Sequence, residues 1–212
     1  MTSRMILKID HSRPDEQIIE SAACILGKGG VVVTPTETRY GLLGRIDDMH
    51  VVEKIFELKK RALSLPTAVF VMSGDDIFRL GHKNRLAELL LEKLLPGPLT
   101  LVLKNRSEYR APIVIDDKIG LRFSSSPVVS RLLEKTGLNL TATSANVSGK
   151  KEPETAAEIA DFFGTGVDLY LDCGPLTALP STVVDCSGKE MKMLREGAVR
   201  ETSIREILAG DG

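Results

Sequence analysis

The sequence predicts an α/β protein built on a twisted, open, mixed sheet flanked by helices. Short β-branched runs alternate with segments of helical periodicity along most of the chain, which is typical of α/β domains. The run 30–35 is rich in β-branched residues and the run 67–73 in apolar residues, as expected of strands buried on both faces. The last part of the chain is richer in strands, which favours a mixed sheet over a purely parallel one.

The first half of the chain carries several helix signals. A short strand over 5–9 precedes a helix for which Ser12 is a candidate N-cap, with acidic residues in the first turn and glycines at the end. The next helix, over 47–61, is expected to begin at Asp47 or Asp48. Further elements are expected as strands over 30–35 and 67–73 and as a leucine-rich helix over 84–97.

The second half continues the alternation. A helix over 126–137 has Ser126 and Pro127 at its start and Gly137 at its end, the usual asymmetry of helix boundaries. Another helix is expected over 152–164. Strands are expected over 98–105, 119–124, 138–145, 168–174, 181–187 and 191–197. Because no internal repeat or long linker interrupts the chain, residues 1–212 are expected to form a single domain.

The composition is that of an ordinary globular protein. Hydrophobic residues make up 42% of the 212 residues and the formal net charge is −1, so no global field attracts nucleic acid or an anionic membrane. No segment approaches the ~20 apolar residues of a membrane helix, and the N-terminus has no signal-peptide pattern. The three cysteines, Cys24, Cys173 and Cys186, are scattered, which fits a reducing cytoplasm better than a disulfide framework.

Common catalytic signatures are missing from the sequence. It has no GxxxxGK[ST] loop, no GxGxxG turn after a strand and no GxSxG elbow. His11, His50 and His82 lie in separate segments without metal-ligand spacing. We therefore expect no metal centre built from protein side chains alone.

Small hydroxyl side chains and single cations instead gather at predicted strand ends. Each feature has a simple structural explanation: the basic residues 59–61 complement a helix dipole, arginines on strands extend to solvent, and Thr100 has high β-propensity. The polar stretch 141–149 could equally be a surface loop or an anion pocket. Because all of these hydroxyl and basic side chains occur at predicted strand ends, together they predict a crevice that binds phosphate or carboxylate. The segments concerned are 34–41, 59–61, 96–100, 141–146 and 180–182, together with Arg122 and Arg195.

In this order, the motifs resemble the YrdC/YciO family, whose best-known members are threonylcarbamoyl-AMP synthases. The resemblance rests on "GGVVVTPTETRYGL", "LKKR", "LLPGPLTLVL", "IGLRF", "TSANVSG", "STVVD" and "LREGAV", and it covers about residues 10 to 200. The chain ends soon after the last motif, so it is similar to the short, single-domain form of the family.

The resemblance implies a YrdC-like (RibB-like) fold with a deep, positively charged cavity. It also implies that L-threonine, bicarbonate and ATP react, with Mg²⁺ assisting, to give threonylcarbamoyl-AMP and pyrophosphate. The product would then pass to a complex that modifies adenosine in tRNA. Some relatives are linked to binding tRNA or double-stranded RNA.

The resemblance assigns roles to nine residues. Two basic residues would hold the phosphates and the bicarbonate-derived group. Two hydroxyl side chains and an arginine, which can bind a carboxylate through two N–H groups, would hold threonine. Polar residues at the ends of strands would hold the nucleotide. The implied catalytic residues are Lys59 and Arg61, the threonine-binding residues are Thr36, Arg122 and Ser181, and the nucleotide-binding residues are Ser144, Asn146, Arg195 and Thr100, with no metal ligand among them.

The chain departs from the family pattern at several positions. Ala62 and Leu65 replace a proline and a nucleotide-contacting asparagine, and Phe70 replaces a histidine near the threonine side chain. Glu152 replaces a serine that helps to bind ATP, and Arg39 stands where an apolar residue is usual. With these departures, the sequence resembles the divergent YciO-like branch of the family more than the main synthases. Two alternatives therefore stay open: an RNA-binding relative with little catalysis, and an ATP-dependent enzyme with another amine or acyl substrate.

Overall fold

The structure, a computed structural model, describes residues 4–150 and 153–210 of the chain. In these residues, eleven strands form one mixed sheet in the order β1-β9-β2-β3-β8-β4-β7-β5-β10-β11, with β6 paired to β7. The strands are β1 (Ile6–Lys8), β2 (Val32–Pro35), β3 (Tyr40–Leu43), β4 (Ala68–Val71), β5 (Leu99–Lys104), β6 (Val114–Ile115), β7 (Lys118–Phe123), β8 (Leu140–Ser144), β9 (Leu169–Asp172), β10 (Thr182–Asp185) and β11 (Lys192–Arg195). The helices are α1 (Glu16–Gly27), α2 (Met49–Leu58), α3 (Gly74–Leu80), α4 (Arg85–Leu94), α5 (Pro127–Thr136), α6 (Ala156–Phe163), a 3₁₀ turn η1 (Gly164–Gly166) and α7 (Glu201–Ala209).

The fold class predicted from the sequence is confirmed, and most helix boundaries follow their capping residues. Asp48 caps α2, and Ser126 caps α5, which has Pro127 in its first turn and Gly137 in the left-handed conformation at its end. The predicted cap of α1 was wrong. Asp15, not Ser12, accepts the hydrogen bonds of the first free amides, because α1 begins only at Glu16.

Four elements escape the sequence prediction: β3, α3, β6 and α7. The most important is β3, which pairs antiparallel with β2 from Pro35↔Tyr40 to Val32↔Leu43. The stretch that follows β2 is therefore not an open loop but the tip of a hairpin, residues 36–39. This hairpin brings polar side chains back over the sheet.

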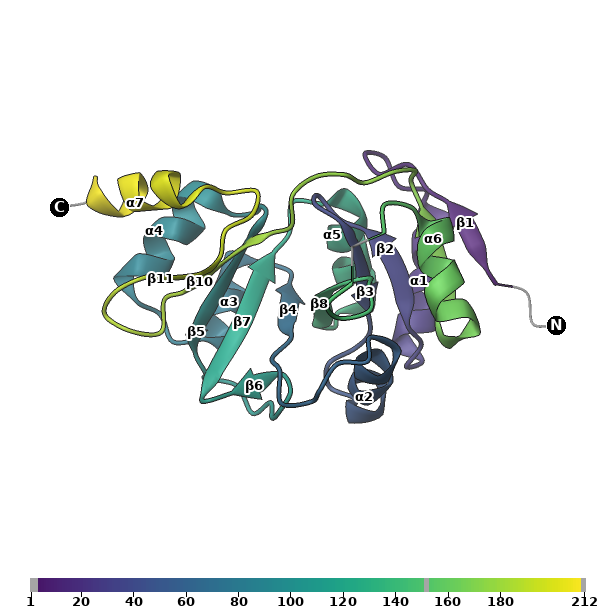
Figure 1. Cartoon of the computed structure of the whole chain (residues 1–212), viewed down its shortest axis with the longest axis horizontal. Helices are drawn as coiled ribbons and strands as arrows, with labels where there is room; N and C mark the ends of the chain where they lie inside the picture. Colours follow the sequence, from purple (N-terminus) through teal and green to yellow (C-terminus); the bar gives the residue numbers. More distant parts are fainter. Residues whose placement is uncertain (1–3, 151–152, 211–212) are drawn as a thin grey trace.

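The sheet divides into two halves that share β8, which pairs with β3 on one side and with β4 on the other. One half is formed by β1, β9, β2 and β3. Figure 1 shows β1, β2 and β3 of this half together with α1, α5 and α6. Helices α1 and α5 pack on the face that carries Val32 and Leu43, while α2 and α6 pack on the face that carries Val33 and Leu42. This half is thus covered on both faces.

The second half contains β4, β7, β5, β10 and β11 (Figure 1). Helices α3, α4 and α7 bury one of its faces, with Val71, Leu101 and Leu121 in the shared core. The alternate residues of the same strands, Phe70, Thr100 and Arg122 among them, point to the opposite face, because side chains alternate along a strand. That opposite face forms the floor of a cavity.

Within residues 4–150 and 153–210, no helix is long and apolar enough to span a membrane.

Candidate active site

A cavity of about 600 Å³ lies over the open face of the second half-sheet, under the β2–β3 hairpin. This volume is typical of sites that hold a small-molecule ligand. The chain between β9 and β10 crosses from one half of the sheet to the other (Figure 1) and contributes Pro180 and Ser181 to the wall. The charged residues that line the cavity are Arg39, Arg61, Lys118, Arg122 and Arg195 on the basic side and Asp116 and Asp185 on the acidic side.

The floor of the cavity is set by strand register. Phe70 of β4 lies opposite Arg122 of β7, and Ala68 lies opposite Gly120 in the same strand pair. On the other side, Thr100 of β5 pairs with Val183 of β10. Because residues two apart share a face, these strands place an arginine and a hydroxyl side by side above a floor of small residues.

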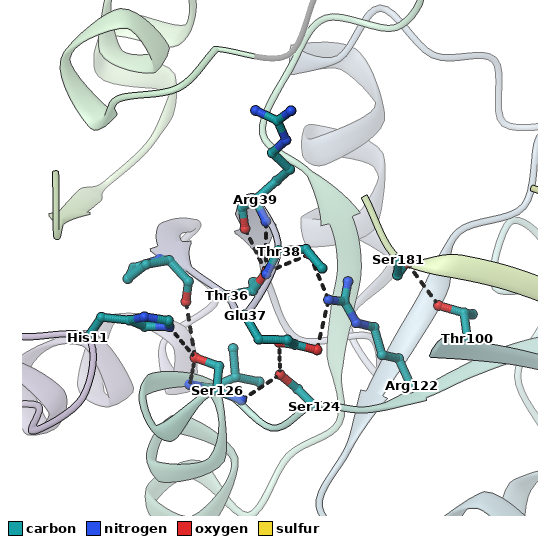
Figure 2. A network of polar contacts seen from close by, with 12 residues as sticks. His11, Thr36, Glu37, Thr38, Arg39, Thr100, Arg122, Ser124, Ser126 and Ser181 are labelled. Atoms are coloured by element: carbon teal, nitrogen blue, oxygen red, sulfur yellow. Dashed lines mark hydrogen bonds and ion pairs between the residues drawn. The ribbon is translucent and has the colours of Figure 1, made fainter. Parts of the chain in front are cut away.

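Arg122 lines the cavity and is held by a carboxylate, a hydroxyl and an aromatic ring (Figure 2). Its Nη2 donates to Glu37 Oε1 at 3.0 Å and to Thr38 Oγ1 at 2.9 Å. Its guanidinium carbon lies 5.1 Å from the centre of the Phe70 ring, within the range of a cation–π contact. The Arg122 and Glu37 side chains are only 9% and 11% exposed, so this ion pair is largely removed from water.

The hairpin tip is held by its own hydroxyl groups. Thr36 Oγ1 donates to the carbonyl oxygen of Arg39 at 2.7 Å and accepts from the backbone amide of Thr38 at 3.1 Å. Thr36 and Thr38 are almost fully buried, yet both contribute to the cavity wall. The Arg39 side chain turns away from Arg122 (Figure 2), and its Nη1 donates to the carbonyl oxygen of Leu176 at 3.0 Å.

On the opposite wall, Ser181 and Thr100 face each other with their hydroxyl oxygens 3.4 Å apart (Figure 2). Arg195 of β11 binds the same serine twice, through Nε to its carbonyl oxygen at 3.0 Å and through Nη2 to its hydroxyl at 3.1 Å. Thr100 lies on β5, Arg195 on β11 and Ser181 just before β10, and the three form one polar cluster that can bind an anionic or hydroxylated group.

Lys59, the last residue before the loop after α2, points toward the end of β8. Its Nζ donates to the carbonyl oxygens of Ser144 and Asn146, the latter at 2.9 Å, and to Asn146 Oδ1 at 3.2 Å. Ser144 Oγ in turn donates to Asn146 Oδ1 at 2.7 Å. The polar stretch at the end of β8 is thus folded around a buried ammonium group.

Arg61 differs from Lys59 because it lines the cavity. One of its Nη groups donates to the carbonyl oxygen of Pro66 at 2.7 Å, whereas its buried Nε has no hydrogen-bond partner among the described residues. Burial lowers the pKa of the guanidinium. A partly desolvated cation that lines a cavity is suited to bind an anionic ligand.

Lys118 and Asp185 form another polar cluster in the cavity wall. Lys118 Nζ donates to Asp185 Oδ2 at 2.7 Å, and the Ser187 amide donates to Oδ1 at 2.8 Å. Burial raises the pKa of this carboxyl, but the bonds from Lys118 and Ser187 outweigh burial and hold the pKa below its ordinary value. The Asp185 carboxylate is therefore ionised at neutral pH.

The structure brings most of the sequence-predicted site residues together. Lys59 and Asn146 are not among the cavity-lining residues and lie behind the wall, in contact with each other. Glu152 lies outside the described residues. The residues that line one cavity, as the sequence predicted for a common site, are Thr36, Arg61, Thr100, Arg122, Ser144, Ser181 and Arg195.

Sequence reasoning missed the residues that support the site. Glu37 and Thr38 hold Arg122, and Ser124 holds Glu37, although Glu37 lies 85 residues from Arg122 in the chain. A carboxylate placed between hydroxyls in a predicted anion site was the available signal, since it implies a nearby cation. Lys118 and Asp185, 67 residues apart, had no comparable local signal.

A family model named for Sua5, YciO and YrdC, and described as "Telomere recombination", matches residues 24–197. Among curated proteins, the Bacillus subtilis "Threonylcarbamoyl-AMP synthase" is 31% identical over 93% of this chain. The match covers 58% of that relative, so the chain spans little more than half of its length.

Two solved structures have the same fold. Pyrococcus abyssi Sua5, in a structure described as complexed with L-threonine, superposes with a TM-score of 0.88 at 32% identity, covering 96% of this chain and 61% of that one. Escherichia coli YciO superposes with a TM-score of 0.87 at 26% identity, covering 95% of this chain and 99% of that one.

Proposed function

The chain belongs to the Sua5/YciO/YrdC family, and we propose that it is a threonylcarbamoyl-AMP synthase. The observation that carries the proposal is one cavity lined by two different arginines: Arg61, for which no ion pair is described, and Arg122 on the floor, whose charge is balanced by Glu37. The first suits a polyphosphate and the second the carboxylate of an amino acid. The excess of basic over acidic lining residues supports a positively charged cavity.

The reaction has two bond-forming steps. The amino nitrogen of L-threonine adds to the carbon of bicarbonate, and water and a proton are lost to give a carbamate. A carbamate oxygen then attacks the α-phosphorus of ATP, and pyrophosphate leaves with the electron pair of the broken P–O bond. Neither step needs a nucleophilic side chain, so positioning and electrostatic stabilisation account for catalysis.

Each wall of the cavity has a task in this reaction. We assign the leaving pyrophosphate to Arg61 and Arg195, because both are cavity-lining cations, and the nucleotide to Ser144 and Thr100. The amino acid is assigned to Thr36, Arg122 and Ser181. Lys59 and Asn146 act through the backbone of the 144–146 segment, since their polar groups bind each other.

Mg²⁺ fits this site as a companion of the nucleotide. The ion retains several waters and is commonly held by substrate phosphates and one or two carboxylates. Asp116 and Asp185 line the cavity and supply such carboxylates, whereas no group of three or more His, Cys, Asp or Glu able to hold a metal occurs in the described part of the chain. When bound, the ion would neutralise charge on the leaving pyrophosphate.

A second candidate is an ATP-dependent enzyme with another amine substrate. Phe70 is fully buried in the cavity wall and cannot bind the hydroxyl of threonine. Leu65, between two cavity-lining residues, offers the nucleotide no hydrogen bond. Both residues favour an altered substrate preference without removing the arginines.

We further propose that the product passes to a tRNA-modifying complex in the cytoplasm. The three cysteines, Cys24, Cys173 and Cys186, are free, which is consistent with a reducing compartment. The net charge of −1 gives no general attraction for RNA, so direct tRNA or double-stranded RNA binding is the less supported alternative.

The deciding experiment is pyrophosphate release from ATP, Mg²⁺ and bicarbonate, with and without L-threonine, and with L-serine and L-valine in parallel. Threonine-dependent release is expected. Release that depends equally on valine would support the second candidate, because valine matches threonine in shape but lacks the hydroxyl. ATP binding without release in any of these mixtures would contradict the synthase and would require that the second candidate act on an amine other than these three.

A further inference from the structure

We propose that Glu37 is a positioning residue for the amino-acid substrate: it fixes Arg122 so that one edge of the guanidinium belongs to the protein and the rest is left for the substrate carboxylate. This inference rests on the proposed synthase activity. Arg122 lines the cavity, whereas Glu37 does not, so Glu37 acts through Arg122 and not by touching the reacting atoms.

Glu37 is held at both of its oxygens (Figure 2). Oε1 accepts from Arg122 Nη2 at 3.0 Å, and Oε2 accepts from the hydroxyl of Ser124. Ser124 is itself fixed, because its Oγ accepts from the backbone amide of Ser126 at 3.1 Å, at the start of α5. These bonds anchor the carboxylate to the start of α5 independently of Arg122.

The N–H groups of Arg122 divide into two sets. Guanidinium has five N–H groups, and the two on Nη2 are used by Glu37 and Thr38. Among residues 4–150 and 153–210, Nη1 makes no hydrogen bond, and the buried Nε has no partner either. A substrate carboxylate that accepts from Nη1 would give this part of the guanidinium a charge-assisted hydrogen bond.

The aromatic ring of Phe70 adds a third constraint. The guanidinium carbon lies 5.1 Å from the ring centre, so one face of Arg122 is covered while Nη2 is held. With a face and an edge both fixed, the guanidinium has little rotational freedom. Binding the substrate therefore costs little additional ordering of this side chain.

The ion pair also separates the two substrates by charge. Glu37 balances the charge of Arg122 at this point of the cavity, whereas no ion pair is described for Arg61. A neutral pair favours a zwitterionic amino acid over a polyphosphate, because the phosphate oxygens would be repelled by the Glu37 carboxylate. Glu37 thereby keeps ATP and pyrophosphate away from the amino-acid end.

The test compares Glu37→Gln with Ser124→Ala and with a control, Glu134→Gln. Glu37→Gln keeps the size of the side chain and an oxygen for Arg122 but removes the charge; Ser124→Ala frees the other oxygen of Glu37. Glu134→Gln breaks the same kind of ion pair, with Arg131 at 3.0 Å, on the exposed surface of α5. The readouts are KM for L-threonine, KM for ATP, thermal unfolding, and inhibition by inorganic pyrophosphate against L-threonine.

Glu37→Gln is expected to raise the KM for L-threonine roughly ten- to hundredfold, as for loss of a charged hydrogen-bond partner, with KM for ATP unchanged. Pyrophosphate should become a competitive inhibitor against L-threonine in this variant. Ser124→Ala should act in the same direction but less strongly, and Glu134→Gln should match the wild type.

Several outcomes would overturn the inference. A wild-type KM for L-threonine in both Glu37→Gln and Ser124→Ala would show that Arg122 needs no positioning. Equal weakening of L-threonine and ATP, with lower thermal stability, would assign Glu37 a purely structural role. If the wild type itself releases no pyrophosphate and binds no L-threonine in calorimetry, the proposed function fails first and this inference falls with it.

Discussion

The ammonium group of Lys59 lies against Asn146 and donates to both its backbone carbonyl oxygen, at 2.9 Å, and its side-chain Oδ1, at 3.2 Å. Lys59 is only 2% exposed, and its third described bond goes to the carbonyl oxygen of Ser144. A lysine ammonium has three N–H groups, so protein oxygens account for all of them. The positive charge therefore supports the end of β8 from behind the cavity wall.

This arrangement predicts that Lys59→Met loses stability as well as activity. Three buried oxygens would lose a charged donor, and of these the Asn146 Oδ1 would still accept from Ser144 Oγ, so we expect the free energy of unfolding to fall by about 3 kcal/mol. Pyrophosphate release should also be lost, because the 144–146 segment would no longer be held. Urea denaturation and the pyrophosphate assay measure the two effects separately.

Lys93→Met is the matched control, since Lys93 is exposed and its described ion pair is with the neighbouring Glu92. Lys93→Met should change neither the free energy of unfolding nor pyrophosphate release. An inactive Lys59→Met variant with wild-type stability would contradict this role and would favour direct contact between Lys59 and a phosphate.

The fold was largely predictable because its local signals agree with its tertiary contacts. Asp48, Ser126 and Gly137 end or begin helices by hydrogen bonds within a few residues, which the sequence shows directly. The strand β3 was not predictable in the same way. All four of its residues are buried, so it lacks the alternation that identifies a half-exposed strand, and its place depends on pairing with both β2 and β8.

The candidate site was predictable in its chemistry but not in its connections. Cations and hydroxyls at strand ends indicated an anion site, and the structure brings Arg61, Arg122 and Ser181 around one cavity. The sequence could not show that Glu37 takes one edge of Arg122 or that Lys59 turns away from the space. Both facts depend on side-chain directions across residues more than 80 positions apart.

Arg61→Gln is predicted to separate activity from stability. The guanidinium lines the cavity, burial lowers its pKa, and its Nε has no partner among the described residues. Removing the cation should reduce pyrophosphate release by at least ~100-fold, as for loss of an electrostatic group at developing charge. The free energy of unfolding should be unchanged or slightly higher, because a desolvated charge is removed.

The control for this variant is Arg106→Gln. Arg106 also donates to a backbone carbonyl, that of Phe78 at 3.3 Å, but on the exposed surface. Its substitution should leave pyrophosphate release intact. A strongly destabilised Arg61→Gln protein would instead show that the bond to Pro66 is the main contribution of Arg61.

Asp185→Asn is predicted to have a pH-dependent effect on stability. Bonds from Lys118 and Ser187 outweigh the opposing effect of burial and hold the pKa of the Asp185 carboxyl below 3.8 in the folded protein. A lowered folded-state pKa stabilises the protein above the unfolded pKa, and this contribution disappears as pH falls through the folded pKa. We expect Asp185→Asn to cost roughly 1–2 kcal/mol at neutral pH, as for loss of a charged hydrogen-bond partner.

The two proteins should therefore converge in stability as the pH is lowered from about 5 through the folded-state pKa. Urea titrations of wild type and Asp185→Asn across this range measure the difference directly. A difference that stayed constant down to the lowest pH at which both proteins fold would mean that packing of Asp185, and not its charge, is responsible.

Leu65→Asn is predicted to strengthen nucleotide binding. Leu65 is 46% exposed, and its neighbours Ser64 and Pro66 both line the cavity, so an amide at this position can reach a bound nucleotide. Because the leucine is exposed, its removal costs little burial, and stability should be unchanged. We expect the KM for ATP to fall roughly fivefold, the value of one additional hydrogen bond.

Leu63→Asn is a closely matched control for Leu65→Asn. Leu63 is also 46% exposed in the same loop, but it lines a separate small pocket with Phe56 and Lys60 and not the main cavity. Its substitution should leave the KM for ATP at the wild-type value. If both variants changed the KM for ATP equally, the effect would come from the flexibility or solubility of the loop, and Leu65 would have no place beside the nucleotide.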